Sequence, residues 1–328
     1  MSEANPPNRP ISYFTPGQHI GKYVVKRLLG RGGVAEVYRA LNPDLDQDVA
    51  IKVLFPQVLD SPSAVAQFKR EAQSVATLRH PNIVRVFDFH AGEPVSFMVM
   101  ELIEGPTLFR VLRNYPDGMP QDLAIYIFSQ LADAVAYAHD QGIIHRDIKP
   151  GNVLLVDSAR PILTDFGLAR AVGSSQISAG GSNAGTPSYM SPEMASGGEI
   201  YPASDIYSLG LVLYEMITGR LPFRGDTVAS ILMQHIQADP PPPSTFVPGL
   251  APGIEAVIMR ALEKNPASRY RSARDMVREL TEGRERPLFA TVQLPDSIMD
   301  VTRSPDLTRR DTMSSRASLA LSQTVSTM

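Results

Sequence analysis

The sequence predicts an α+β protein in which strands dominate the first third of the chain and helices dominate the rest. Short runs rich in β-branched and aromatic residues are typical of strands, and they occur at 23–25, 49–52, 83–89 and 97–100. A single helical stripe lies among them, whereas helical patterns recur from about residue 122 onward. We therefore expect a small, mostly-β part with one helix, followed by a larger, mainly helical part.

The composition excludes several classes of function. The 328 residues carry a formal net charge of -3 and no basic block, so no nucleic-acid partner is expected. Cysteine is absent, which excludes disulfides, thiolate metal sites and a cysteine nucleophile. Residues 1–15 lack the apolar core of a secretory signal, and the most apolar helical run, 206–217, is shorter than the roughly 20 residues that span a bilayer. We expect a soluble chain with no membrane segment.

The chain begins with a polar stretch, 1–18, that is expected to be a disordered leader. The first strand pattern starts at Tyr23 and leads into a segment that contains Gly30 and Gly32 and ends at Val37. Glycines between two strands let a hairpin fold down so that its backbone N–H groups approach phosphates closely. A glycine-rich hairpin without a ligand remains the alternative at this point.

A lysine and a glutamate are predicted to pair in this part of the chain. Residues 49–51 read as a short apolar strand that ends in Lys52, and 65–75 carry apolar residues at helical spacing. Glu71 lies in that helical stripe, where a charge is costly to bury without a cationic partner. Lys52 is the candidate partner. The proline of His80-Pro81-Asn82 is expected to end the helix.

Two more strands and two long helices follow. The strands are predicted at 83–89 and 97–100, and a helix covers 122–141 with Gly142 as its stop signal. A nearly all-apolar helix at 206–217 is expected to form the buried centre of the helical part.

The most informative stretch lies between these two helices. Residues 145–152 read His-Arg-Asp-Ile-Lys-Pro-Gly-Asn, and Asp165-Phe166-Gly167 follows. Short strands are expected between the two motifs, at 153–156 and 162–163. The side chains of Asp147, Asn152 and Asp165 suit phosphoryl transfer, because one carboxylate must orient the attacking hydroxyl while oxygen ligands hold the cation on the phosphates.

At these residues the chain resembles the eukaryotic-type protein kinases, in particular their bacterial serine/threonine branch. The resemblance covers about residues 20–285 and implies the two-lobed protein-kinase fold. The kinase domain is expected at 19–285, with a small N-terminal lobe at about 19–101 and a larger C-terminal lobe at about 105–285. The joining segment, Glu101 to Gly105, matches the family's hinge.

The resemblance implies catalytic roles that follow the family's general template. Asp147 is the base that orients the hydroxyl, and Lys149 places a charge near the transferred phosphate. Asn152 belongs to the implied catalytic residues, and it also binds the metal, with Asp165 as the second ligand. Tyrosine kinases of the family have Ala or Arg at the position of Lys149, so the lysine implies serine or threonine as the acceptor. The implied cofactors are ATP and Mg²⁺, with Mn²⁺ as the alternative metal.

An ATP site is implied as well. The glycine-rich segment matches the family's G-x-G-x-x-G-x-V loop except at the third glycine, which is Ala35 here. Lys52, positioned by Glu71, would hold the α- and β-phosphates, and the backbone of the hinge would bind adenine, with Met100 at the back of the pocket. The implied nucleotide-site residues are Leu29, Gly30, Gly32, Val37, Ala50, Lys52, Glu71, Glu101, Ile103 and Leu154.

Three structural contacts are also implied by the family. His145 would pack under Phe166 without taking part in proton chemistry. Asp205 would anchor the backbone of the catalytic loop. Glu193, in a Ser-Pro-Glu sequence where the family has Ala-Pro-Glu, would pair with Arg269.

The Gly/Ser-rich stretch 169–184 corresponds to the family's activation segment. Thr186, just after it, would contact Asp147. Arg146 is expected to be a cation without a partner that a phosphate on this segment would bind. The candidate autophosphorylation sites are Ser174, Ser175, Ser178 and Ser182, of which Ser178 and Ser182 rank first. Self-association for phosphorylation in trans is part of this expectation.

The remaining segments are expected to be connectors or tails. Residues 240–243 are four prolines and read as a rigid surface connector. The Ser/Thr-rich stretch 286–328 is expected to be disordered. We expect a cytoplasmic protein, or the cytoplasmic portion of a longer membrane protein.

Three functions remain open from the sequence. The first is an active protein serine/threonine kinase whose partners are proteins carrying Ser or Thr. The second is a catalytically inactive ATP-binding scaffold on the same fold, which the intact chemical residues argue against. The third is a small-molecule phosphotransferase, which would not need the polypeptide-binding sequences at 185–186 and 191–193.

Overall fold

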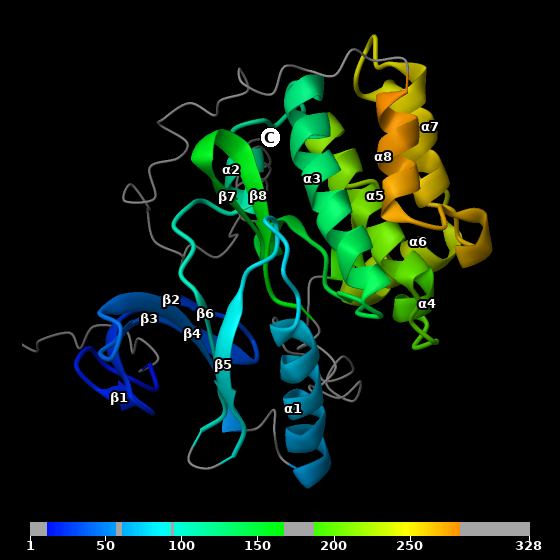
Figure 1. The fold of residues 1–328 in the computed structure, drawn as a ribbon. Helices are drawn as coiled ribbons and strands as arrows, with labels where there is room; N and C mark the ends of the chain where they lie inside the picture. Colours follow the sequence, from blue (N-terminus) through cyan, green and yellow to red (C-terminus); the bar gives the residue numbers. More distant parts are fainter. Residues whose placement is uncertain (1–11, 57–60, 93–94, 167–186, 283–328) are drawn as a thin grey trace, which may run out of the picture.

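The computed structural model describes residues 12–56, 61–92, 95–166 and 187–282, and these form two lobes (Figure 1). A six-stranded antiparallel sheet with the order β1-β2-β3-β4-β6-β5 makes up most of the smaller lobe. Its strands are β1 (His19–Ile20), β2 (Tyr23–Arg31), β3 (Ala35–Asn42), β4 (Gln47–Leu54), β5 (Val86–His90) and β6 (Phe97–Glu101). Each predicted strand is present, although the one expected at 83–89 begins only at Val86.

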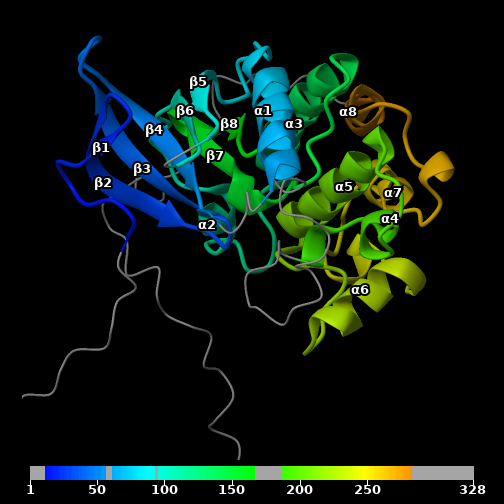
Figure 2. The ribbon, with the colours of Figure 1, turned by 90° about the horizontal axis from the view of Figure 1, so that it is seen from below.

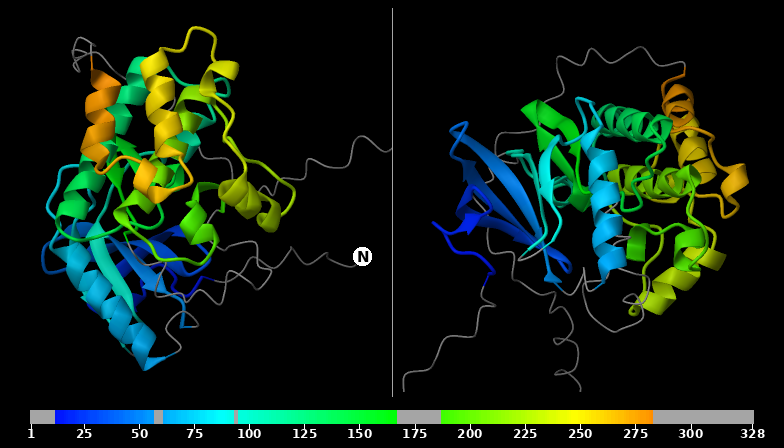
Figure 3. Two further views of the ribbon diagram at one scale, coloured as in Figure 1. Left: turned by 90° about the vertical axis from the view of Figure 1, so that its right-hand side faces the viewer. Right: turned by 60° about the horizontal axis from the view of Figure 1, so that its bottom comes forward.

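Helix α1 (Pro62–Ala76) is the one helix of this lobe within the described ranges and stands between the sheet and the helical lobe (Figures 2 and 3). Ser61 caps its first turn by accepting a hydrogen bond from the N–H of Ala64. The helix ends earlier than predicted. The Thr77 hydroxyl donates to Ser74 O at 2.7 Å, and such a side-chain bond competes with the backbone bonds of a helix. The helix ends at Ala76, before His80 is reached.

The larger lobe is mainly helical. Its helices are α2 (Leu108–Leu112), α3 (Gln121–Asp140), α4 (Pro192–Ala195), α5 (Pro202–Thr218), α6 (Val228–Gln237), α7 (Pro252–Ala261) and α8 (Ala273–Thr281). As predicted, α3 stops before Gly142, which has a φ of +73° that favours glycine. Helix α5 is buried at its centre. A Cβ added to Gly210 would lie 2.8 Å from the Cβ of Ala261, so a glycine lets α5 and α7 pack closely.

The proline run at 240–243 lies only partly on the surface, where all of it was predicted, because Pro242 is exposed but two of its neighbours are not. Pro240 and Pro243 are buried, and the Tyr214 hydroxyl donates to Pro241 O at 3.1 Å. Composition predicted the rigidity of this run, but proline rings are apolar enough to pack against the lobe when a neighbouring hydroxyl satisfies the backbone carbonyl.

Residues 12–18 also differ from the prediction of a disordered leader. Tyr13 N–H donates to the Glu36 carboxylate at 3.0 Å, and Phe14 N–H donates to the Tyr38 hydroxyl at 3.1 Å. This segment is therefore bound to β3, at the outer side of the hairpin that carries the glycine-rich loop. The remainder of the predicted leader and the predicted tail lie outside the described residues.

Within the described ranges, none of the helices combines the length and the apolar character that crossing a bilayer requires.

Candidate active site

A two-stranded antiparallel hairpin brings the two sequence motifs together. Strands β7 (Val153–Val156) and β8 (Arg160–Leu163) pair with Val153 opposite Leu163. Asn152, just before β7, and Asp165, just after β8, therefore emerge at the same end of the hairpin. The backbone N–H and the hydroxyl of Thr164 both donate to Asn152 O, at 2.9 and 3.1 Å, which fixes this end.

The catalytic loop is held from the start of α5. Both oxygens of the buried Asp205 carboxylate accept backbone N–H groups, from His145 at 2.7 Å and from Arg146 at 2.9 Å. The His139 ring also lies 2.8 Å from Asp205. This confirms the predicted anchor. Arg146 adopts a φ of +68°, a conformation that costs energy for a residue with a side chain and that the Asp205 contacts help to hold.

His145 has the predicted structural role. It is 1 % exposed, and its ring centroid lies 4.4 Å from that of Phe166. Burial lowers the pKa of His145 despite the opposing charge of Asp205, so the ring is neutral at neutral pH. In the neutral form Nδ1 accepts the N–H of Asp147, and Nε2 donates to Thr164 O at 2.9 Å.

Asp147 is oriented by two residues of its own loop, a pairing that was not predicted from the sequence. Lys149 Nζ lies 2.9 and 2.7 Å from the two carboxylate oxygens of Asp147. Asn152 Nδ2 donates both to the Asp147 carbonyl at 2.8 Å and to its carboxylate at 2.9 Å. A carboxylate with these fixed donors and a partly exposed side chain is suited to receive a hydroxyl from solvent or substrate.

Lys52 does not pair with Glu71 in this structure. Its ammonium group lies 2.8 Å from the carboxylate of Asp165, whereas Glu71 lies 3.6 Å from Arg146 and accepts a hydrogen bond from Gln67. The predicted pair is therefore wrong for this conformation. The helical pattern at 65–75 indicated that Glu71 needs a cationic partner. That pattern could not show whether the partner is Lys52 or Arg146.

The Lys52–Asp165 contact also sets the charge of the site. Lys52 is 7 % exposed. Burial alone would raise the pKa of Asp165, but the charge and hydrogen bond of Lys52 outweigh it, so this pKa is lowered. Asp165 is thus an anion at neutral pH and can serve as a cation ligand.

The donor set at the end of the hairpin fits a hard divalent cation. Asn152 uses its amide nitrogen on Asp147, so its amide oxygen remains without a hydrogen bond within the described residues. One oxygen of the Asp165 carboxylate binds Lys52. The other oxygen accepts no hydrogen bond from the residues that the structure describes. Amide and carboxylate oxygens are the ligands that Mg²⁺ and Mn²⁺ prefer, with water and phosphate completing the shell.

The apolar residues implied for adenine form one cluster under the sheet. Ala50, Val84, Met100 and Ile162 are its buried members, and Leu29, Val37, Leu102, Ile103, Leu154 and Val156 pack against them. At the hinge, the N–H of Glu101 donates to Arg85 O at 2.9 Å, so its carbonyl is the group left for a base. The backbone of Ile103 has no backbone hydrogen-bond partner among the described residues. The cluster thus supplies an apolar wall beside polar backbone groups.

A cavity of about 410 Å³ lies next to this cluster, between the hinge and β7–β8. Glu101, Ile103 and Ile162 line it, but Asp147, Asn152 and Asp165 do not. The cavity is therefore separate from the polar residues at the end of the β7–β8 hairpin.

The glycine-rich loop is a hairpin, as predicted. Gly30 lies opposite Val37, and Gly32 N–H donates to Ala35 O at 2.8 Å. No atom outside the chain neighbours lies within 4 Å of a Cβ built on Gly30, so the space beside it is open to a ligand. Ala35, where the family has its third glycine, is 2 % exposed and packs in the core.

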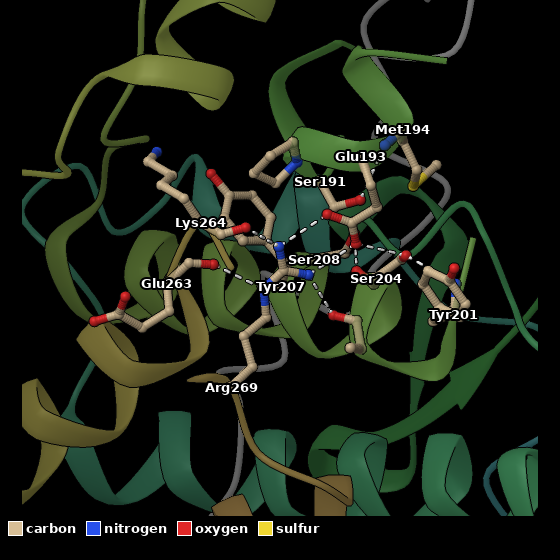
Figure 4. A network of polar contacts seen from close by, with 12 residues as sticks. Ser191, Glu193, Met194, Tyr201, Ser204, Tyr207, Ser208, Glu263, Lys264 and Arg269 are labelled. Atoms are coloured by element: carbon tan, nitrogen blue, oxygen red, sulfur yellow. Dashed lines mark hydrogen bonds and ion pairs between the residues drawn. The ribbon is translucent and has the colours of Figure 1, made fainter. Parts of the chain in front are cut away.

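A polar network in the larger lobe joins α4, the start of α5 and Arg269, which follows the turn 266–268 (Figure 4). Arg269 forms two 2.8 Å contacts with the two oxygens of Glu193, which confirms the predicted pair. Ser204 donates to the same carboxylate at 2.6 Å, and Arg269 also donates to the backbone carbonyls of Ala203, Glu263 and Lys264. The contacts of Arg269 in the part of the chain that the structure describes all join segments of the larger lobe, so the network stabilises this lobe.

Arg269→Met is expected to destabilise the protein by about 3–5 kcal/mol, because Glu193 would remain as a buried carboxylate without its partner. Burial alone would raise the pKa of Glu193, but Arg269 and Ser204 lower it to about 2 from the ordinary 4.5. The stabilisation is thus present above pH 4.5 and is lost as the pH falls toward 2. Denaturant unfolding from pH 7 to pH 3 measures it: the wild type should lose stability on acidification by a larger amount than Arg269→Met. If the free energy of unfolding of the two proteins fell equally between pH 7 and pH 3, the role given to the Glu193–Arg269 pair would be wrong.

Several residues of the predicted site cannot be placed. Thr186 and the serines at 174, 175, 178 and 182 lie outside the described residues. Sequence reasoning missed two site residues that the structure reveals. Thr164, which ties the hairpin end together, precedes the Asp-Phe-Gly motif directly. Gln67, which binds Glu71, lies one helical turn earlier and could have been found from that spacing.

Comparison with known proteins matches this geometry to one family. The family described as "Protein kinase domain" matches residues 23–280. The serine/threonine-protein kinase PknB of Mycobacterium leprae is 40 % identical over 272 residues, which cover 81 % of this chain and 43 % of that protein. The serine/threonine-protein kinase PrkC of Bacillus subtilis is 40 % identical over 256 residues, covering 78 % of this chain and 39 % of that protein. The chain thus spans about two-fifths of the length of these relatives.

Solved structures agree with the fold. A crystal structure of the kinase domain of PknI from Mycobacterium tuberculosis superposes with a TM-score of 0.67 and 28 % sequence identity, over 82 % of this chain and 99 % of that one. A second crystal structure of the same domain gives a TM-score of 0.67 and 29 % identity, over 82 % of this chain and 98 % of its own. The predicted two-lobed fold is confirmed.

Proposed function

Because the chain belongs to the protein kinase family, in its bacterial serine/threonine branch, we propose that it transfers the γ-phosphate of ATP to serine and threonine hydroxyls of proteins. One observation carries the proposal. The Asp147 carboxylate is oriented by Lys149 and Asn152, beside the Asn152 and Asp165 oxygens that suit a divalent cation.

The residues divide the chemistry between them. Asp147 orients the substrate hydroxyl and takes its proton as the oxygen attacks the γ-phosphorus and the bond to ADP breaks. Lys149 shifts from the Asp147 carboxylate toward the transferred phosphoryl group and balances its charge. A divalent cation held by Asn152 and Asp165 neutralises the phosphate charge when it is bound.

Nucleotide binding requires a change of partners at Lys52. In this structure its ammonium group is bound to Asp165, and phosphates of ATP would compete for it. Glu71 is held by Arg146 at 3.6 Å and would have to leave that arginine to pair with Lys52. We take the productive state to be the one in which this exchange has occurred.

Incubation with labelled ATP and a generic protein substrate tests the proposal. Transfer of label to Ser or Thr of the protein supports it. Nucleotide binding without transfer would indicate an inactive scaffold instead, and labelling of small molecules alone would indicate a small-molecule phosphotransferase. Mg²⁺ is proposed as the physiological metal over Mn²⁺, and titration of the rate with each cation decides between them.

The proposed setting is the cytoplasm, where ATP is available, either for this chain alone or for this domain within a longer protein. The chain matches 43 % of PknB and 39 % of PrkC, and these fractions are compatible with a chain that acts alone and with a domain of a longer protein. Self-association is proposed for phosphorylation in trans. A rate of autophosphorylation that rises with the square of protein concentration would support it, and a first-order rate would contradict it.

We expect little preference for arginine upstream of the target hydroxyl. Kinases that select arginine use acidic side chains at positions that correspond here to Thr107 and Gly151. Gly151 has no side chain, and the Thr107 hydroxyl caps α2 by accepting the N–H of Arg110. A peptide array measures the preference, and a strong arginine requirement would refute the prediction.

Autophosphorylation of the segment before Thr186 is expected to raise activity. The prediction that Arg146 lacks a partner is wrong, because Glu71 lies 3.6 Å from it. The physical argument changes accordingly: a phosphate carries more charge than a carboxylate and would compete with Glu71 for Arg146. Release of Glu71 would allow the pairing with Lys52.

Mass spectrometry of the wild type and of Asp147→Asn tests for this modification. The candidates remain Ser174, Ser175, Ser178 and Ser182, with Ser178 and Ser182 ranked first. Phosphate is expected in this segment of the wild type and not of the variant, and replacement of all four serines by alanine should lower activity. A wild type without phosphate there, or a fully active quadruple variant, refutes the idea.

A further inference from the structure

A short N-terminal strap, residues 12–18, crosses the outer side of the hairpin that carries the glycine-rich loop. Its backbone is tied to β2, because Gly17 N–H donates to Val25 O and Val25 N–H donates to Gln18 O, both at 2.8 Å. The Phe14 ring meets the Tyr38 ring edge-on, with centroids 5.8 Å apart. The strap therefore has a defined position on the sheet, although most of its side chains stay exposed.

The strap completes the hydrogen bonding of a fully buried carboxylate. Glu36, at the start of β3, is 0 % exposed. One of its oxygens accepts from Arg31 Nε at 2.6 Å, and the other accepts from the Tyr38 hydroxyl and from the Tyr13 N–H. A buried carboxylate is costly unless all its lone pairs are used, so the strap's N–H is needed to keep Glu36 in this place.

Glu36 in turn fixes the base of the glycine-rich loop. Arg31 and Glu36 face each other across β2 and β3, and they flank the turn formed by residues 32–35. Their ion pair closes this turn at its base, while the Gly32 N–H bonds Ala35 O within it. Movement of Glu36 would therefore move both strands that hold the loop.

A second contact links the strap to the tip of the same loop. The Tyr13 ring stacks on the Phe55 ring, with centroids 5.4 Å apart and planes at 25°. Phe55 follows β4, and its N–H donates to Val34 O, inside the turn, at 2.9 Å. Tyr13 thus reaches the loop by two routes, through Glu36 at the base and through Phe55 at the tip.

We propose that the strap, through Tyr13 and Glu36, is a positioning element that holds the glycine-rich loop in place for the phosphates of the nucleotide. Tyr13 and Glu36 are positioning residues, since they act through Arg31 and Val34 on the loop backbone. The proposal rests on the proposed kinase function for its kinetic consequence. Its structural consequence, a loop whose order depends on the strap, stands without catalysis.

Tyr13→Pro is the decisive variant in the full chain, because proline lacks the N–H that Glu36 accepts. Hydrogen exchange of the Gly32 and Phe55 amides, in protein without nucleotide, reports the order of the loop. We expect both amides to exchange about tenfold faster than in the wild type, the effect of losing one hydrogen bond to a charged group. The KM for ATP should rise by a similar factor, with kcat changed less than about twofold.

Two further variants and one control complete the test. Glu36→Gln keeps the shape of the side chain and weakens its bond to Arg31. It should change the amide exchange rates and the KM in the same direction as Tyr13→Pro. It also serves as the test if Tyr13→Pro does not fold. Tyr13→Phe keeps the ring and the N–H and should behave as the wild type. Ile254→Val, at a buried side chain of α7 in the other lobe, controls for general loss of stability.

The outcomes separate the two proposals. Unchanged amide exchange and unchanged KM in both Tyr13→Pro and Glu36→Gln would overturn the strap's role. A rise in KM of equal size in Ile254→Val would also overturn it, because the effect would then be one of stability. If the wild type transfers no phosphate, the kinase proposal fails, and the exchange rates still decide on the strap.

Discussion

Asp147→Asn is expected to bind ATP as tightly as the wild type and to transfer phosphate about 10²- to 10⁴-fold more slowly, the range that a general base contributes. The amide of asparagine cannot take the proton of the substrate hydroxyl. Affinity is expected to survive because it comes from the apolar cluster around Ala50 and Met100, the hinge and the phosphate contacts, none of which involves Asp147. Calorimetric titration with ATP and a label-transfer assay measure the two quantities separately.

A matched control uses the same substitution where it should have no effect. Asp140, at the end of α3, has a 56 % exposed side chain and binds Arg274 at the surface. Asp140→Asn is expected to keep wild-type transfer. Loss of the fold or of ATP affinity in Asp147→Asn would contradict the role assigned to Asp147, because it would show that the carboxylate supports structure instead of chemistry.

Lys52→Ala is expected to lower the transfer rate by about 10²- to 10³-fold, the size of effect that removing one preorganised charge-stabilising group has. The lysine is 7 % exposed, and in the absence of nucleotide its charge is balanced by Asp165. The substitution therefore removes the cation that the phosphates would meet and leaves Asp165 without its partner. Steady-state kinetics with ATP as the varied substrate should show both a lower kcat and a higher KM.

The control for this variant is Lys22→Ala. Lys22 is half exposed and forms its ion pair with Asp44 at the far end of the sheet, so its loss should leave the kinetics unchanged. Wild-type activity of Lys52→Ala would mean that the strand lysine was assigned the wrong role. An inactive but still ATP-binding Lys52→Ala, with a normal thermal transition, supports the assignment.

Contiguous motifs explain why so much of the site was predictable. Residues 145–152 carry the proposed base, Asp147, and the two side chains that contact it within one loop, and the pairing of β7 with β8 follows from two short apolar runs. Asp205 and Arg269 were found because the resemblance supplied their partners. Local patterns and family motifs thus predicted the fold and named the residues that the structure places near Asp147.

Contacts between distant segments account for what was missed. Glu71 had two cations within reach, and the choice of Arg146 depends on how α1 is placed against the helical lobe, which helical spacing does not encode. The strap was missed because residues 12–18 are few and show no periodic pattern. Their contacts are with residues distant in the sequence, among them Val25 and the buried carboxylate of Glu36, and the burial of Glu36 cannot be read from a strand pattern with one glutamate in it.

The anchoring of the catalytic loop by Asp205 has a consequence for the order in which the protein is made. The two backbone bonds join residues 60 and 59 positions apart, so the ribosome releases His145 and Arg146 well before the carboxylate that holds them. Chain growth at about 5–20 residues per second leaves several seconds between the two events. During that interval the growing chain has its glycine-rich loop and its hinge, but the loop that carries Asp147 lacks its anchor. A chain that ends before α5 would therefore lack both hydrogen bonds that hold the backbone of His145 and Arg146.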